Sequence, residues 1–191
     1  MQTKEEVRTI AKARRNELSA DRQAEASAAI TGLLLRSPLF AGATTLFCFV
    51  GMPGEPDTAG LIEAALEAGK TVCVPRCYRK GKMDAVPIRS LSELKPDRYG
   101  IPGPSAEAEA LDPGRIDLVI VPCLAAGRNG ERLGHGAGYY DRFLPSCPGE
   151  SVCLCFEDLL IDHIPMDRYD VRMDYVLTER GWYGSRAHQV T

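Results

Sequence analysis

Short apolar runs alternate along the chain with longer segments in which apolar residues recur every three or four positions. The first pattern is typical of buried strands and the second of amphipathic helices. Strands are therefore predicted over residues 44–50, 71–76, 83–89, 117–122, 151–156 and 174–179. Because strands and helices alternate, we expect an α/β fold, with residues 1–191 forming a single domain of three α/β/α layers around a mainly parallel sheet.

Three helices have ends that the sequence marks. Thr3 and Glu6 form the T-x-x-E pattern of a capping box, so the first helix is expected to begin there. A second helix is expected to start near Ser19 and to end before Pro38. A third is expected over residues 58–69, which close on a glycine that can stop a helix.

Residues 117–122 (DLVIVP) are almost continuously apolar, as a central strand of a parallel sheet should be. The stretch before it, residues 94–114, is rich in proline and glycine and predicts a long irregular loop. A glycine-rich stretch follows the strand. In open α/β sheets ligands gather at the carboxyl ends of the strands, so we expect the binding site there.

Composition and charge narrow the possible functions. The net charge is −3 and the hydrophobic fraction 45%, which argues against broad binding to nucleic acid or anionic membranes, since these need a basic surplus. No apolar run approaches the roughly 20 residues that span a bilayer, and the charged N-terminus lacks the apolar core of a secretory signal. Five of the seven cysteines lie in apolar runs, which fits a reducing compartment. We therefore expect a cytoplasmic protein that binds neither nucleic acid nor membrane.

The glycine-rich stretch, RLGHGAGYYDRFL over residues 132–144, contains three glycines at alternate positions. Such glycines let backbone N–H groups approach an anion, and a following helix would direct its positive end to the same point. The spacing is neither the Rossmann nor the P-loop pattern, and glycines alone fit a tight turn before a helix equally well. Arg132, which could neutralise phosphate, the two tyrosines, and Asp141, a hard oxygen donor suited to Mg²⁺, together favour the ligand site.

The first helix carries a stripe of four cations: Lys4, Arg8, Lys12 and Arg15. At 100° per residue they cover about 80° of the helix circumference. A stripe of this kind is usually a solvated face. The alternative is that Lys4 and Arg8 reach the phosphates of a nucleotide.

Carboxylates stand at two further places. Glu55 lies between two prolines in the loop over residues 51–58, and a stiff loop positions a carboxylate well for a polar ligand. Asp170 and Asp174 frame the start of the last predicted strand. From the local sequence, Asp174 is equally consistent with a metal ligand and with a turn residue.

Taken together, the segment VPCLAAGRNGERLGHGAGYYDRFL resembles the signature of the 5-formyltetrahydrofolate cyclo-ligase family, also called 5,10-methenyltetrahydrofolate synthetases. Its members carry a strand ending in Val-Pro and then Arg-Leu-Gly-x-Gly-x-Gly-Tyr-Tyr-Asp. Other matches follow in the expected order: Lys4, Arg8 and Arg15; GEPDT with Glu55; GKTVCVPR; and a terminal D-x3-D-x3-TE formed by Asp170, Asp174, Thr178 and Glu179.

The resemblance implies ATP- and Mg²⁺-dependent conversion of 5-formyltetrahydrofolate to 5,10-methenyltetrahydrofolate, with release of ADP and phosphate. By position, the implied ATP-binding residues are Lys4, Arg8, Arg132, Leu133, Gly134, His135, Gly136, Ala137, Gly138, Tyr139 and Tyr140. The implied folate-binding residues are Val50, Glu55, His135, Gly136, Ala137, Gly138 and Tyr139. Asp141 and Asp174 would bind Mg²⁺. The partners would be the reduced folate and ATP, and we expect a monomer or a weak homodimer.

This chemistry suits the residue types in the glycine-rich stretch. ATP phosphorylates the formyl oxygen, N10 attacks the activated carbon, and phosphate leaves as the ring closes. The enzyme needs no nucleophile of its own, only alignment and neutralisation of the charge that spreads over the phosphoryl group. We therefore expect a phosphoryl-transfer site around Arg132 and Tyr140, and no covalent catalysis.

The sequence departs from the family pattern at five positions. Ala126 and Gly127 stand where Phe-Asp is usual, Gly103 replaces the acid of Gly-Ile-x-Glu-Pro, Leu159 replaces a glutamine, and Tyr169 replaces a histidine. One alternative is therefore a non-catalytic or regulatory relative that binds nucleotide or folate without turnover. Another is an enzyme of similar architecture that acts on sugar phosphates or CoA esters; the Tyr-Tyr-Asp run argues against the second.

Overall fold

A seven-stranded sheet forms the centre of the computed structural model, which describes residues 2–96 and 100–190. Its first four strands, in spatial order, are β11 (Gly181–Tyr183), β10 (Tyr175–Thr178), β9 (Glu150–Leu154) and β6 (Leu118–Val121). The order continues with β1 (Thr45–Cys48), β2 (Thr71–Cys77) and β3 (Met83–Ile88). The five inner strands pair in parallel, and β3 and β11 are antiparallel edges.

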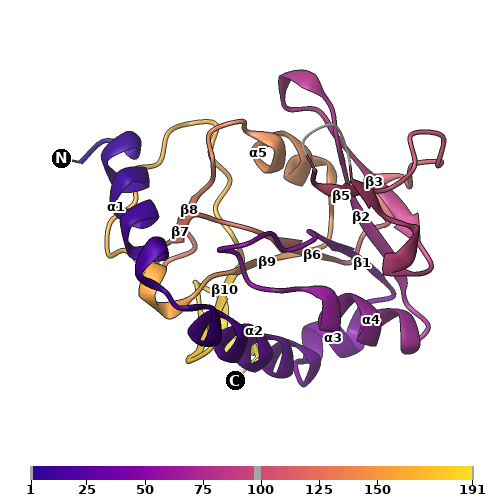
Figure 1. The fold of residues 1–191 in the computed structure, drawn as a ribbon, viewed down its shortest axis with the longest axis horizontal. Helices are drawn as coiled ribbons and strands as arrows, with labels where there is room; N and C mark the ends of the chain where they lie inside the picture. Colours follow the sequence, from indigo (N-terminus) through magenta and orange to yellow (C-terminus); the bar gives the residue numbers. More distant parts are fainter. Residues whose placement is uncertain (1, 97–99, 191) are drawn as a thin grey trace.

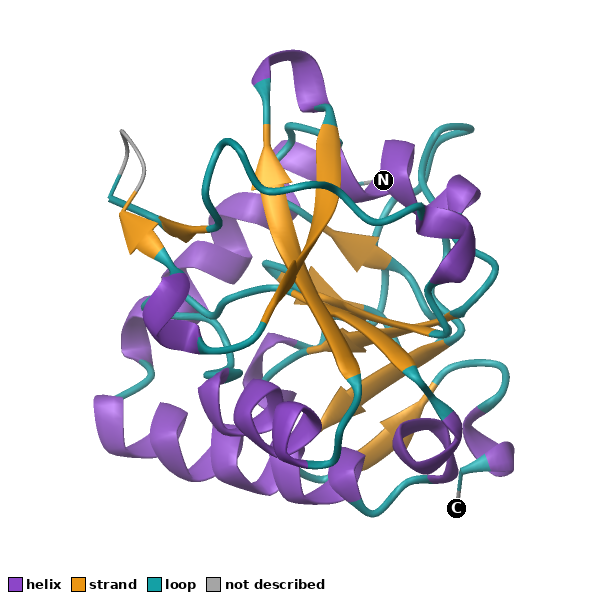
Figure 2. Ribbon diagram, turned by 90° about the vertical axis from the view of Figure 1, so that its right-hand side faces the viewer, coloured by secondary structure: helices purple, strands orange, loops and turns teal. Residues whose placement is uncertain are grey.

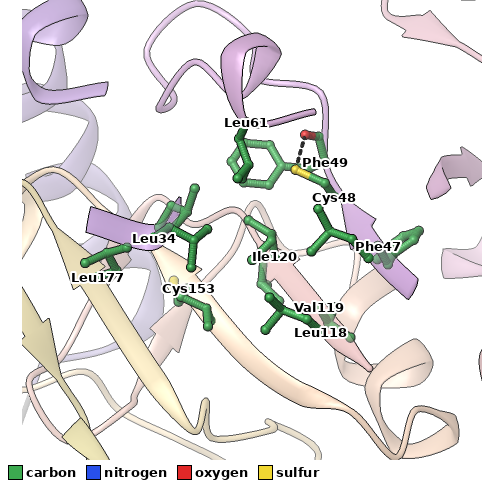
Figure 3. Close-up of a cluster of buried hydrophobic side chains, with 14 of the residues drawn as sticks. Leu34, Phe47, Cys48, Phe49, Leu61, Leu118, Val119, Ile120, Cys153 and Leu177 are labelled. Atoms are coloured by element: carbon green, nitrogen blue, oxygen red, sulfur yellow. Dashed lines mark hydrogen bonds between the residues drawn. The ribbon is translucent and has the colours of Figure 1, made fainter. Parts of the chain in front are cut away.

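The predicted central strand is confirmed as β6, which lies in the middle of the sheet with all four residues buried. One face of the sheet is covered by α2 (Ala20–Leu35), α3 (Pro38–Gly42) and α4 (Ala59–Glu67), which lie below it in Figure 1. Figure 3 shows Leu34 of α2 and Leu61 of α4 packed beside Ile120 of β6. Burying each such side chain contributes about 1.5–3 kcal/mol, so this layer fixes the position of the strands.

The opposite face is covered by shorter elements: α1 (Lys4–Glu17), α5 (Tyr139–Phe143) and a small hairpin of β7 (Ala125–Ala126) and β8 (Arg132–Leu133). In α5, the rings of Tyr140 and Phe143 pack at a tilt against the ring of Phe47 in β1. A separate small core joins α1 to the hairpin through Val7, Ala11, Leu124, Ala125, Leu133 and Ile164. The three-layer prediction is confirmed, although the second layer contains more loop than helix.

The expected helix ends are also confirmed. The capping box of Thr3 and Glu6 begins α1, and the Ser19 side chain accepts a hydrogen bond from the backbone of Arg22 at the start of α2. Sequence reasoning missed α3, a five-residue helix that Pro38 begins, and β11, a three-residue edge strand. Elements this short leave too few positions for a periodicity to appear.

Strands β2 and β3 form a hairpin that extends beyond the rest of the sheet (Figure 2), and the short turn η1 (Arg79–Gly81) lies at its tip. Gly81 has a φ of +74°, and a Cβ atom there would lie 2.7 Å from the carbonyl oxygen of Ala137. The hairpin tip therefore packs directly against the glycine-rich stretch, and only a glycine permits the approach.

The irregular loop predicted over residues 94–114 is largely found as such, but it contains strand pairing. It includes the two-residue strands β4 (Lys95–Pro96) and β5 (Pro102–Gly103) and the turn η3 (Pro113–Arg115), and residues 97–99 lie outside the described part of the chain. The remaining short turns are η2 (Leu91–Glu93), η4 (Leu144–Ser146), η5 (Glu157–Leu159) and η6 (Ala187–Gln189). Among the helices described, none is both long and apolar enough to cross a membrane.

Candidate functional site

A cavity of about 620 Å³ opens at the carboxyl end of β6, where Pro122 follows the strand. Three elements that are distant in sequence meet around it: α1, the glycine-rich stretch and the segment before β10. The position agrees with the expected location of ligand sites in parallel sheets. The lining residues are Lys4, Arg8, Pro122, Asp167, Tyr169, Asp170 and the continuous stretch of residues 132–142.

The glycine-rich loop, residues 134–138, forms one wall of this cavity. Gly136 and Gly138 have φ values of +100° and +68°, which side chains rarely allow. The loop follows the β7–β8 hairpin rather than β6 itself, and the helix after it, α5, has only five residues. The expected contribution of a helix dipole is therefore small, and the backbone N–H groups and neighbouring cations are left as the anion-binding elements.

Arg132 lies beneath the loop with a side chain only 6% exposed. Its Nη1 donates to the carbonyl of Pro122 (3.2 Å), and its Nη2 to Oδ2 of Asp141 (3.2 Å). The guanidinium also lies 5.5 Å from the centre of the Tyr140 ring, and its buried Nε has no hydrogen-bond partner within the described chain. The charge is therefore fixed in position while donor capacity remains for an anion.

The two predicted metal ligands have different surroundings. Asp141 lines the cavity, where Oδ1 accepts the backbone N–H of Val171 (3.1 Å) and Oδ2 contacts Arg132. Asp174 directly precedes β10, so it lies at the amino edge of the parallel sheet. There Oδ2 accepts the N–H and hydroxyl of Ser151 (both 2.8 Å). The structure thus corrects the pairing: it does not bring Asp174 to the cavity that Asp141 lines, and the turn interpretation of Asp174 is the better one.

Lys4 and Arg8 extend from α1 into the cavity wall. Lys4 Nζ lies 2.7 Å from Oδ2 of Asp167 and also pairs with Asp170. Burial lowers the pKa of Lys4, but the hydrogen bonds that it donates to these two carboxylates outweigh that effect, so the pKa is raised and the amine stays charged. Arg8 Nε donates to the carbonyl of Gly134 (3.1 Å), so both cations contact or face the site.

The other two cations of the stripe, Lys12 and Arg15, have different surroundings. Lys12 is exposed, as the solvated-face interpretation expects. Arg15 lies against the loop that carries Glu55, because a Cβ atom on Gly54 would be only 2.8 Å from Cδ of Arg15. The first helix therefore contacts both the glycine-rich loop and the loop at the end of β1.

Glu55 lies close to the glycine-rich loop, although neither Glu55 nor Val50 is part of the cavity lining. Its side chain is 14% exposed; Oε2 accepts the N–H of Met52 (3.0 Å), and Oε1 is 3.8 Å from Nε2 of His135. The loop is closed by Thr58, whose hydroxyl donates to the carbonyl of Phe49 (2.7 Å). Val50, between strand and loop, is half-buried against the core.

The adjacent tyrosines have different roles in the structure. Burial raises the pKa of Tyr140 well above its usual value, and the positive charge of Arg132 opposes this only in part. Its hydroxyl is therefore neutral and able to donate. The Tyr139 hydroxyl donates to the carbonyl of Tyr78 (2.8 Å) at the tip of the β2–β3 hairpin. Sequence reasoning missed this tip, although the run YRKGK between two predicted strands was a signal of a turn rich in charge.

Most of the departures from the family pattern lie away from the cavity lining. Ala126 is fully buried in β7, and Leu159 is buried in the core. Gly127 lies under Glu131, whose Oε2 would be 2.4 Å from a Cβ atom at that position. Gly103 pairs with Lys95 in the small β4–β5 sheet.

Tyr169 is the one departure that lines the cavity. The other four departures lie outside the cavity lining.

Comparisons with known proteins identify the family and the fold. The model of the 5-formyltetrahydrofolate cyclo-ligase family matches residues 1–179. A 5-formyltetrahydrofolate cyclo-ligase from Mycolicibacterium smegmatis is 32% identical over 93% of this chain and 94% of its own. One from Mus musculus is 29% identical over 91% and 92%. The solved structure of Aquifex aeolicus 5,10-methenyltetrahydrofolate synthetase superposes with a TM-score of 0.85 at 26% identity, covering 97% of this chain and 94% of that one.

Proposed function

The chain belongs to the 5-formyltetrahydrofolate cyclo-ligase family, and from that premise we propose that it is an ATP-dependent ligase that converts 5-formyltetrahydrofolate to 5,10-methenyltetrahydrofolate. The observation that carries the proposal is the cavity around the glycine-rich loop, in which Lys4, Arg8 and Arg132 surround exposed backbone. A triphosphate is the ligand that such a group of cations and small residues suits best.

The reaction in this proposal has two steps. The formyl oxygen attacks the γ-phosphorus of ATP, so that ADP leaves and the oxygen becomes part of a phosphate leaving group. N10 of the folate then attacks the formyl carbon and closes the five-membered ring. N10 gives up its proton to water or to the departing phosphate, and the C–O bond breaks with release of phosphate. Both steps need alignment and charge neutralisation more than proton transfer.

Each group in the cavity has a part in this scheme. Lys4 and Arg8 bind the phosphate chain from the side of α1. Arg132, fixed beneath the loop, neutralises charge on the transferred phosphoryl group, and the neutral hydroxyl of Tyr140 donates to an oxygen of the reacting centre. Folate enters beside Glu55 and Val50, with residues 135–139 between the two substrates.

Mg²⁺ fits this donor set only as a companion of the nucleotide. Mg²⁺ is usually bound in such sites by one or two carboxylates together with substrate phosphates and water. Asp141 lines the cavity and its oxygens retain free lone pairs, whereas Asp174 lies elsewhere. We propose Asp141 as the protein's ligand; the ion would neutralise phosphate charge when bound.

The direct test follows the absorbance of the methenyl product after purified protein is mixed with 5-formyltetrahydrofolate and ATP with Mg²⁺. We expect product to form with all three components and to fail when ATP is omitted or when EDTA removes Mg²⁺. If the protein binds ATP in a calorimeter yet forms no product, the non-catalytic alternative replaces the proposal.

A Glu55→Gln variant tests the folate side of the site. Losing this carboxylate should raise the KM for 5-formyltetrahydrofolate about tenfold, the order expected from a lost charge-assisted hydrogen bond of about 1.4 kcal/mol, and change the KM for ATP less than twofold. Steady-state kinetics with each substrate varied in turn measures both values.

Asp57→Asn on the same loop is the matched control for Glu55→Gln, because it removes a charge that caps α4 rather than one near the cavity. Equal increases of both KM values in Glu55→Gln would mean that the substitution disturbs the loop, and the folate role would be wrong.

A further inference from the structure

Tyr169 is an exposed aromatic side chain at the rim of the cavity. It is 68% exposed, one of three large hydrophobic residues that the described chain leaves exposed, together with Tyr78 and Ile101. Tyr169 alone of the three lines the cavity. Because Tyr169 is both exposed and part of the cavity lining, its ring is available to a ligand bound there.

The turn that presents Tyr169 is rigidly built. Oδ1 of Asp167 accepts the backbone N–H of Tyr169 (2.9 Å), and Oδ2 of Asp170 accepts the N–H of Asp167 (2.6 Å). Both carboxylates also pair with Lys4. Lys4 is proposed to bind the phosphate chain, so the ring and the phosphate-binding amine belong to one connected unit.

Arg168 packs over one face of the Tyr169 ring. Its guanidinium carbon lies 4.6 Å from the centre of the Tyr169 ring, within the range of a cation–π contact. With Arg168 over one face, the ring stays 68% exposed and lines the cavity. Flat heterocyclic bases stack on such rings, and Arg guanidinium groups strengthen the stack.

We propose that Tyr169 stacks on the purine base of ATP and so supplies nucleoside affinity that the phosphate-binding groups cannot. The inference rests on the proposed function and adds a base-binding surface to it. Folate is the weaker candidate for this surface, because its proposed partner Glu55 is not part of the cavity lining, whereas Tyr169 lines the cavity and its turn is joined to Lys4. The histidine expected here from the family resemblance is also a flat ring, so Tyr169 replaces one stacking group by a larger one.

The test compares ATP with inorganic tripolyphosphate, which carries the phosphates without the base. In Tyr169→Ala, calorimetry should give an ATP Kd about tenfold higher, from a stacking contribution of about 1–3 kcal/mol, and an unchanged Kd for tripolyphosphate. Tyr169→Phe and Tyr169→His should keep most of the ATP affinity. In steady state, Tyr169→Ala should raise the KM for ATP and leave kcat unchanged.

Tyr78→Ala, an exposed tyrosine outside the cavity lining, is the matched control and should keep the ATP affinity. Equal losses of affinity for ATP and tripolyphosphate in Tyr169→Ala would show that the turn has collapsed. An unchanged affinity for both would show that the ring does not contribute to binding. Either result overturns the inference. A selective rise in the KM for folate would also overturn it, by assigning the ring to the other substrate. If the wild-type protein does not bind ATP, the proposed function fails together with this inference. If the wild type binds ATP and Tyr169→Ala binds it equally well, only the stacking role of Tyr169 fails.

Discussion

Replacing Arg132 with methionine is expected to lower kcat by at least about 10³-fold, the order lost when an arginine that neutralises a transferred phosphoryl group is removed. Methionine keeps much of the volume of the side chain and removes its charge and donors. Arg132 is suited to this role because Pro122 and Asp141 fix the orientation of its guanidinium while Nε remains unpartnered in the described structure.

The same substitution has a cost in stability that must be separated from catalysis. Without Arg132, the Asp141 carboxylate loses its charged partner. Breaking a fully buried ion pair costs about 3–5 kcal/mol. Asp141 is 21% exposed, so we expect a smaller loss of about 1–3 kcal/mol in the free energy of unfolding, measured by urea denaturation.

A double variant, Arg132→Met with Asp141→Asn, isolates the stability effect. It removes the unpaired charge, so the free energy of unfolding should return toward that of the wild type. Its kcat does not report on Arg132, because Asp141 is the proposed Mg²⁺ ligand, so kcat is compared between Arg132→Met and the wild type. Lys12→Met, which removes a solvent-exposed cation from the stripe on α1, is the control for net charge. The catalytic role would be refuted if Arg132→Met kept more than a tenth of the wild-type kcat while remaining folded.

The general course of the chain could be predicted because its signals are local. The strand β6 is read from an uninterrupted apolar run, and the starts of α1 and α2 from side chains that cap the helix within three residues. The place of the site follows from one topological rule, that ligands gather at the carboxyl ends of parallel strands. These features depend on near neighbours or on the order of elements, and the sequence contains both.

Features that depend on distant contacts could not be predicted. Asp170 and Asp174 are four residues apart in an extended segment, yet one pairs with Lys4 and the other with Ser151 at the opposite edge of the sheet. Nor does the sequence reveal that the tip of the β2–β3 hairpin packs against the glycine-rich loop. The hydrogen bond from Tyr139 to Tyr78, for example, joins residues 61 positions apart.

Gly127 stands where the family resemblance leads us to expect an aspartate, and a carboxylate from a neighbouring residue occupies the turn. The Glu131 carboxylate lies over Gly127, accepts the backbone N–H of Asn129 (3.1 Å) and pairs with Arg172 (2.6 Å). Burial raises the pKa of Glu131, but the hydrogen bond from Arg172 and the backbone donors lower it below the usual value overall. A carboxylate thus remains at this turn although position 127 has no side chain.

Replacing Gly130 with alanine is expected to lower the free energy of unfolding by about 2–4 kcal/mol, the largest effect on stability that we predict for a single methyl group. Gly130 has a φ of +89°, and a Cβ atom there would lie 2.3 Å from the carbonyl oxygen of Met173. The carbonyl of Gly130 also accepts the N–H of Met173 (2.8 Å). Because both contacts are to backbone, neither chain segment can move away alone.

Substitutions at two other glycines show how much of the loss in stability comes from backbone strain and how much from the collision. Gly69 has a φ of +75°, and a methyl group added there would meet nothing within 4 Å, so Gly69→Ala should cost only the backbone strain, about 1 kcal/mol. Gly60 lies in α4 with open space around it, so Gly60→Ala should be neutral or stabilise by about 0.5–1 kcal/mol. The difference between Gly130→Ala and Gly69→Ala then measures the collision with Met173.

The Gly130→Ala substitution should also affect ATP binding in the cavity. The segment that begins at Val171 leads directly to Met173, and the N–H of Val171 donates to Asp141. If the collision displaces this segment, the KM for ATP should rise in the folded variant while the KM for folate changes less, since Glu55 is on another loop. A destabilised Gly130→Ala protein with both KM values unchanged would mean that the displacement stops short of Asp141, and that the turn over residues 127–131 supports the fold without positioning the nucleotide site.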